Sequence, residues 1–135
     1  MTWRQYSTLD IAANSEDIVQ ALNKCEDEIW LPIREWQRIL NGKSFIASDG
    51  LGYLVYHVVH GDRQRVLCLD RVINTDKVKF DWFGAMQFIK YVSIAWKIDT
   101  VEIRINDPGL IRMIGKVVPE GYTTDIVTYL KIKEK

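Results

Sequence analysis

SFIASDGLGYLVYHVVHGDRQRVLCLDRVI, residues 44–73, contains three apolar segments that are separated by two short turns. Val, Ile, Leu and Tyr dominate the segments, and the β-branched and aromatic residues among them favour strands. Ser48-Asp49-Gly50 and His60-Gly61-Asp62 have the composition of turns. Turns this short join antiparallel neighbours, so the stretch predicts a three-stranded meander. The expected strands are Ser44–Ala47, Leu51–Val59 and Arg65–Ile73.

The residues after this meander predict a crossover helix and further strands. Asp81 can cap a helix that runs to about Lys97 and is apolar over a broad face, so it should lie across the sheet. Val101–Ile105 alternates apolar and polar residues, as a strand does. A strand, a helix and a second strand in this order imply one parallel pair in a mixed sheet. A short helix at Leu110–Ile114 and a last strand at Asp125–Lys133 complete the prediction.

The residues before the meander predict a short strand and two helices. Thr2–Ser7 alternates, and from Asn14 the pattern becomes helical, with Asn14 as the cap and Asp17 as the acidic arm of a capping box. Pro32 suits the first turn of the second helix, which Asn41-Gly42 ends. The side chains expected to face inward are Ile18, Leu22, Cys25 and Ile29 in the first helix and Ile33, Trp36, Ile39 and Leu40 in the second.

Length and composition indicate one α+β domain over residues 1–135. Lys plus Arg and Asp plus Glu are 18 each, so no basic excess points to nucleic acid. We expect no membrane partner, because no apolar run approaches the length of a spanning helix. Cys25 and Cys68 form no CxxC pair and suit buried free thiols in a reducing compartment. The expected location is therefore cytoplasmic.

The order of these elements resembles that of the GNAT acyltransferase superfamily. Asn106 after a strand, then Ile114-Gly115 and Glu120-Gly121 before a last strand, resemble that family's C-terminal motif. The resemblance implies a mixed, mostly antiparallel sheet flanked by helices, in the order β-α-α-β-β-β-α-β-α-β. A weaker likeness to small GNAT-like phage proteins is carried by IRMIGKVVPEGYT and the Lys-rich end.

The resemblance also implies an acetyl-CoA site between the fourth and fifth strands. In that family the pyrophosphate binds backbone N–H groups of a glycine-containing loop at the start of the long helix. Here the stretch from Asn74 to Gly84 has no glycine before Gly84, which should already lie inside the helix. Lys77 and Lys79 could contact phosphates, and Asn106 follows the next strand. Asp81 would occupy the anion position if it caps the helix.

Asp70 is the candidate general base, because a carboxylate on the fourth strand can accept a proton from an amine. Backbone groups at Leu69, Arg71 and Val72 would hold the acyl group. Leu67 and Leu69 should share one face of the strand, and Cys68 and Asp70 the other. If that other face meets solvent, Asp70 would instead pair with a nearby Arg on the surface. Ile111 stands where the family often has a Tyr acid, and isoleucine cannot donate a proton.

Other polar residues suggest no further site. His57 and His60 should point to opposite faces of a strand, so we expect neither a metal site nor a Cys–His arrangement. Glu35 and the acidic residues 26–28 are expected on a solvated helix face. Trp30 and Trp36 could line an acceptor pocket, although core packing is the more common role for such residues.

Three hypotheses follow. The first is an acyl-CoA-dependent N-acyltransferase with a degenerate cofactor loop, for which the partner is a small-molecule or protein amine. The second is a non-catalytic binding or structural protein with a GNAT-like fold, for which the partner is a protein. If phage-encoded, it would serve in the virion or in host interaction. The third is an α+β module unrelated to acyltransferases, which would lack a gap between the fourth and fifth strands.

Overall fold

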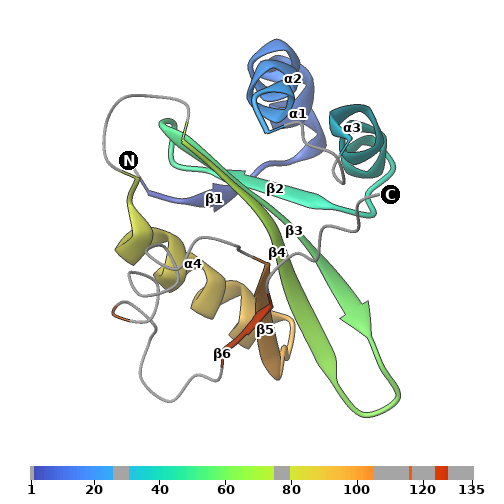
Figure 1. The fold of residues 1–135 in the computed structure, drawn as a ribbon, viewed down its shortest axis with the longest axis vertical. Helices are drawn as coiled ribbons and strands as arrows, with labels where there is room; N and C mark the ends of the chain where they lie inside the picture. The colour runs from blue at the N-terminus through green and yellow to red at the C-terminus, as the bar shows by residue number, and fades with distance from the viewer. Residues whose placement is uncertain (1, 26–30, 75–79, 105–115, 117–123, 128–135) are drawn as a thin grey trace, which may run out of the picture.

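The computed structural model describes residues 2–25, 31–74, 80–104, 116 and 124–127. Six strands form one sheet in the sequence order β1 to β6, and helices cover both of its faces (Figure 1). The strands are β1 (Arg4–Gln5), β2 (Phe45–Ser48), β3 (Gly52–His60), β4 (Arg65–Asn74), β5 (Thr100–Arg104) and β6 (Thr124–Val127). The helices are α1 (Thr8–Ala13), α2 (Ser15–Asn23), α3 (Pro32–Leu40) and α4 (Trp82–Ala95).

The strand pairings confirm the predicted meander. Strands β1 to β4 pair antiparallel in succession, whereas β4 and β5 pair parallel across the α4 crossover. The described part of β6 also pairs parallel with β5, so the described sheet has two parallel pairs instead of the expected one. The expected helix Leu110–Ile114 and the end of the last predicted strand lie outside the described residues.

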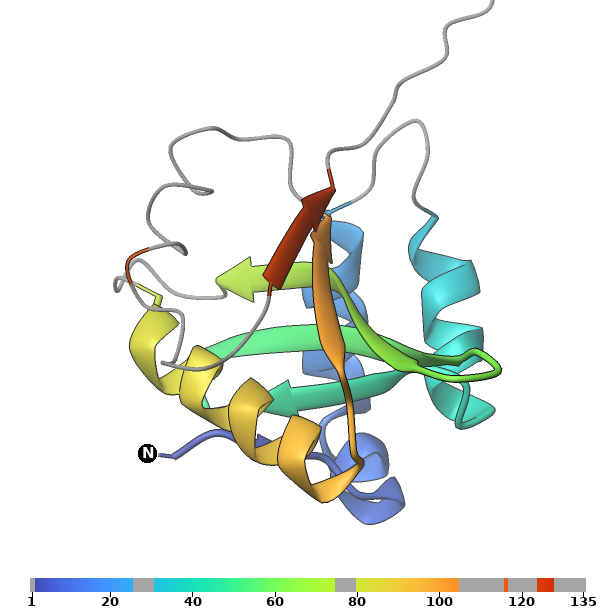
Figure 2. The ribbon, with the colours of Figure 1, turned by 90° about the horizontal axis from the view of Figure 1, so that it is seen from below.

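Two apolar cores lie on opposite faces of the sheet. Helices α1, α2 and α3 lie on one side and α4 on the other (Figures 1 and 2). Leu54, Leu67 and Leu69 face α4, as the broad apolar face of that helix predicts. Tyr53 and Val55 face the α2–α3 side, because neighbouring residues of a strand point to opposite faces.

The N-terminal region differs from the prediction by one helix. Ser7 and Asp10 form a capping box that starts α1, which the prediction left without structure. Asn14 stands between α1 and α2, as expected of a cap, but its side chain donates to the Asp10 carbonyl instead of capping α2. The expected box between Asn14 and Asp17 is therefore wrong, because the preceding helix already uses the Asn14 side chain.

Helix α3 begins and ends as predicted, but it buries different side chains. Pro32 is at its N-terminus, and Gly42 follows its end with a positive φ of 71°. Ile39 is buried as expected, whereas Ile33 and Leu40 are 62% and 58% exposed. Glu35 is buried instead, so its expected place on a solvated face is wrong. The helix thus turns a charged residue toward the sheet.

An irregularity in β4 determines which side chains reach that charged residue. Val55 pairs with Arg71 and Tyr56 with Leu69, so Asp70 is an extra residue, a β-bulge. Before the bulge, Leu67 and Leu69 share one face, as predicted, and this face meets α4. After it the alternation is shifted by one residue, and Val72 packs on the α4 side. The bulge therefore separates two regular segments of β4 and places Asp70 between them.

Candidate functional site

The Asp70 carboxylate pairs with the imidazole of His57 on the neighbouring strand. Asp70 Oδ2 lies 2.6 Å from His57 Nδ1. Asp70 is only 7% exposed, so the alternative of a solvated carboxylate on the sheet surface is wrong. The hydrogen bond to Asp70, followed by one involving Cys68, raises the pKa of His57 to about 9. His57 is consequently an imidazolium at neutral pH.

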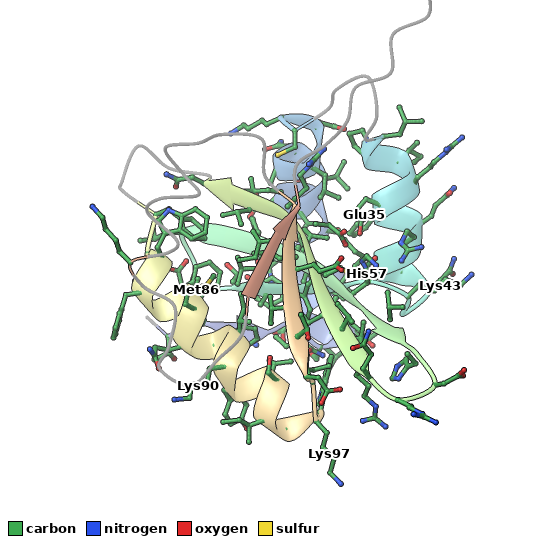
Figure 3. The ribbon with its side chains drawn as sticks, turned by 60° about the horizontal axis from the view of Figure 1, so that its bottom comes forward. Glu35, Lys43, His57, Met86, Lys90 and Lys97 are labelled. Atoms are coloured by element: carbon green, nitrogen blue, oxygen red, sulfur yellow. The ribbon has the colours of Figure 1, made fainter. Side chains whose placement is uncertain are left out.

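Glu35 of α3 belongs to the same polar cluster. Figure 3 shows its side chain beside that of His57, between α3 and the sheet. Glu35 is 6% exposed, and burial raises the pKa of its carboxyl. The negative charge of Asp70 raises this pKa further, whereas a hydrogen bond with Ser44 and the charges of Arg38 and His57 lower it. Glu35 Oε1 has no hydrogen-bond partner within the described ranges.

Cys68 and Glu102 extend the cluster along β4 and β5. Cys68 pairs with His57 in the β3–β4 register and with Glu102 in the β4–β5 register. Its Sγ lies 3.8 Å from Glu102 Oε2. Contrary to expectation, a thiol, an imidazole and a carboxylate thus share one face. Cys68 is only 1% exposed, however, and a buried thiol in such a place is typically unreactive.

The residues predicted to bind a cofactor are only partly brought together. Leu69 is buried in the α4 core, and Val72 packs against the same core. Arg71 Nη1 lies 3.4 Å from the Asp70 carbonyl oxygen. Lys77, Lys79 and Asn106 lie outside the described residues. Within the described residues, β4 pairs with β5 as far as Leu69 and Ile103, directly before the bulge, and β4 itself continues to Asn74.

The start of α4 does not fit the pyrophosphate of coenzyme A. As predicted, Asp81 caps the helix, and Gly84 lies inside it. Asp81 Oδ1 accepts a hydrogen bond of 2.9 Å from the Gly84 amide. A helix N-terminus binds an anion through such amides and its dipole, and here a carboxylate of the chain occupies that position. A phosphate group there would lie beside a like charge.

A pocket of about 360 Å³ lies next to α3. Its walls come from α1, α3 and β2, and Trp36 lines it, as the sequence suggested for an acceptor pocket. Trp30 lies outside the described residues. Ser44 lines the pocket and also accepts a 3.0 Å hydrogen bond from Arg38 Nε. Because Ser44 also bonds to Glu35, it connects this pocket to the polar cluster.

The described residues were also searched for a metal site and for a membrane-spanning helix. No group of three or more His, Cys, Asp or Glu side chains in them is arranged to hold a metal ion. The search of the same part of the chain for a helix long and apolar enough to cross a membrane found none.

The sequence singled out Asp70 as a candidate site residue but gave no role to His57 or Glu35, which lie beside it. A signal for His57 was present, because a short hairpin turn with His60 opposite Arg65 places His57 opposite Cys68. Asp70 then lies diagonally across from His57, within side-chain reach. No comparable signal marks Glu35, since burial of a helix glutamate depends on the tertiary packing of α3.

Comparison with solved structures shows the fold. A protein described as a probable acetyltransferase matches with a TM-score of 0.66 and 11% identity, over 99% of this chain and all of its own. TTHA1254 from Thermus thermophilus matches in a mutant form with a TM-score of 0.61 and 14% identity. Its wild type gives 0.58 and 13%, and both TTHA1254 matches cover 100% of this chain and 99% of the other. Neither a protein-family model nor a curated protein matches the sequence. The chain therefore has an acetyltransferase-like fold.

Proposed function

We propose that this protein uses its acetyltransferase-like fold to bind a ligand or a partner. We also propose that it does not use acyl-CoA as GNAT enzymes do. The observation that carries the proposal is the Asp81 carboxylate at the start of α4. A pyrophosphate would have to displace this carboxylate and would gain no glycine-lined loop in return, because no glycine lies between Asn74 and Asp81.

Fold alone does not decide function, since one fold can host many activities. The family resemblance also places Ile111 where an acid would protonate the leaving thiolate, which weakens the case for catalysis. Phage origin, a virion or host partner and a cytoplasmic location remain predictions from the sequence.

A second candidate function, N-acyl transfer, is favoured by one observation. Asp70 lies at a β-bulge next to Leu69, the last residue of β4 that pairs with β5 within the described residues, and it is hydrogen-bonded to His57. In this candidate the pair would accept the proton of an acceptor amine. His57 must lose its own proton first, so turnover would rise with pH toward the His57 pKa of about 9. An arylamine acceptor, which is neutral over this range, would isolate that dependence.

Isothermal titration with acetyl-CoA, and with free CoA as a control, separates the two candidates. We expect no binding heat from the wild type at millimolar ligand. Asp81→Ala removes the carboxylate from the helix start and should gain affinity for CoA, whereas Asp62→Ala removes an exposed hairpin carboxylate and should not. Micromolar binding of acetyl-CoA to the wild type would refute the first proposal. An acceptor screen with an Asp70→Asn variant would then test the second.

A further inference from the structure

The pocket of about 360 Å³ next to α3 lies where β1 ends and α1 begins, at the β1–β2 side of the sheet. Its described lining comes from within residues 5–15 and 36–46. None of these lining residues belongs to β4, β5 or α4, and Glu35, His57 and Asp70 are not among them. The pocket is therefore separate from the polar cluster and from the place where the family resemblance puts acetyl-CoA.

The lining of this pocket favours a neutral ligand. No Asp, Glu, Lys or Arg is among the described residues that line it, although 27% of the chain is charged. An ion that entered such surroundings would lose its hydration without gaining a partner of opposite charge. A neutral molecule avoids this cost.

The size and the apolar walls of the pocket favour an aromatic ligand. Trp36 and Tyr6 line it and are only partly buried, and Leu40 lines it while 58% exposed. A ligand that covers these side chains gains from the apolar surface removed from water, and aromatic rings pack well against one another. In another protein a cavity of about 150 Å³ holds benzene, so 360 Å³ has room for a bicyclic ring system.

The Ser44 hydroxyl supplies a buried polar group to the same pocket. Ser44 is 2% exposed, and its Oγ accepts a 3.0 Å hydrogen bond from Arg38 Nε. It also bonds to the Glu35 carboxylate, which can only accept, so the hydroxyl proton goes there. A hydroxyl oxygen has two lone pairs, and among the described residues these bonds leave one of them. Ser44 can consequently accept a hydrogen bond from a ligand but cannot donate one.

We propose that this pocket binds a neutral bicyclic aromatic molecule with a ring N–H, of the indole kind, and that Ser44 Oγ accepts the hydrogen bond from this N–H. The ring would pack against Trp36 and Leu40. This inference rests on the proposed ligand-binding function and names the chemistry and the place of the ligand.

Titrations of the full chain at pH 7.5, followed by backbone amide NMR shifts, test the proposal with three probes. Indole has the ring and the N–H. Benzofuran has the same shape without the donor and should bind about three- to tenfold more weakly. Indole-3-carboxylate is an anion and should not bind. No binding of indole, or equal affinities for indole and benzofuran, would overturn the proposal.

Two pairs of measurements on variants locate the ligand. Ala12→Phe fills the pocket from α1 and should abolish indole binding, whereas Ala13→Phe adds the same ring at an exposed neighbour outside the pocket lining and should not. Equal binding of indole to both variants would contradict the assigned place.

Ser44→Ala should weaken indole binding to the level of benzofuran and leave benzofuran binding unchanged. A structural defect would weaken both ligands alike, and that result would overturn the role of Ser44. The acetyl-CoA titration contains no indole, so failure of this proposal and failure of the proposed function are distinguishable.

Discussion

Stability should fall between about pH 6.5 and 9 because of the His57–Asp70 pair. The hydrogen bond to Asp70 raises the pKa of His57 from 6.5 to about 9 in the folded protein. The folded state thus holds a proton that the unfolded state has already lost in this range. The stabilisation is fully present below the unfolded pKa and disappears as the pH rises through the folded one. At 1.36 kcal/mol per pKa unit, the loss amounts to about 3 kcal/mol.

Urea unfolding followed by tryptophan fluorescence at half-unit steps from pH 6 to pH 10 measures this loss. Asp70→Asn should flatten the wild-type profile, because the imidazolium then lacks its anionic partner. His60→Gln is the matched control, since His60 is exposed on the same strand, and its profile should parallel that of the wild type. A reducing agent keeps Cys25 and Cys68 as thiols.

Proton NMR provides an independent measurement. The chain has two histidines, so the His60→Gln variant leaves a single imidazole, that of His57. Its ring resonances should titrate with a midpoint near 9. A midpoint at or below 6.5, or equal slopes of stability against pH for the wild type and Asp70→Asn, would refute the reasoning.

Two further predictions concern single side chains. Burial raises the pKa of Glu35, so the stability of the wild type should decline as the pH rises above about 4.5. Glu35→Gln should remove that decline, and the control Glu16→Gln should keep it. Parallel urea-unfolding profiles for the wild type and Glu35→Gln would contradict this prediction. Tyr56→Phe removes the 2.7 Å hydrogen bond from the buried Tyr56 hydroxyl to Gln5 and should lower the free energy of unfolding by about 1 kcal/mol. The control Tyr91→Phe, at an exposed position, should change it by less than about 0.5 kcal/mol. Equal effects of the two substitutions would show that the bond to β1 contributes nothing.

Most of the fold was predicted from local sequence patterns, and the errors of that prediction have local causes. Alternation and turn chemistry were enough for the meander, and Asp81 and Pro32 marked the starts of two helices. Helix α1 was missed because its six residues bury no side chain and so show no apolar stripe. The bulge at Asp70 was missed because an extra residue in a strand leaves no sign in a short run of alternating residues.

The candidate site was less predictable, since its members come from three separate elements. Asp70 was proposed from its residue type and its strand, and Cys68 was correctly placed on the same face. To predict the contact between Asp70 and His57, the register of the β3–β4 hairpin must be known. To predict that Glu35 lies in the same cluster, the packing of α3 on the sheet must be known. That packing exposes Ile33 and buries a glutamate, which is the reverse of what hydrophobicity alone predicts.

This reversal is also the best argument that the cluster serves binding. A buried ion pair seldom stabilises a protein more than apolar side chains of similar volume would, because both charges lose their hydration. Leucine or methionine in place of Glu35, His57 and Asp70 would therefore give at least the same stability. Helix α3 contains an apolar residue, Ile33, but exposes it and buries Glu35 instead. A fold kept only as a scaffold gains little from a buried carboxylate whose Oε1 has no hydrogen-bond donor among the described residues.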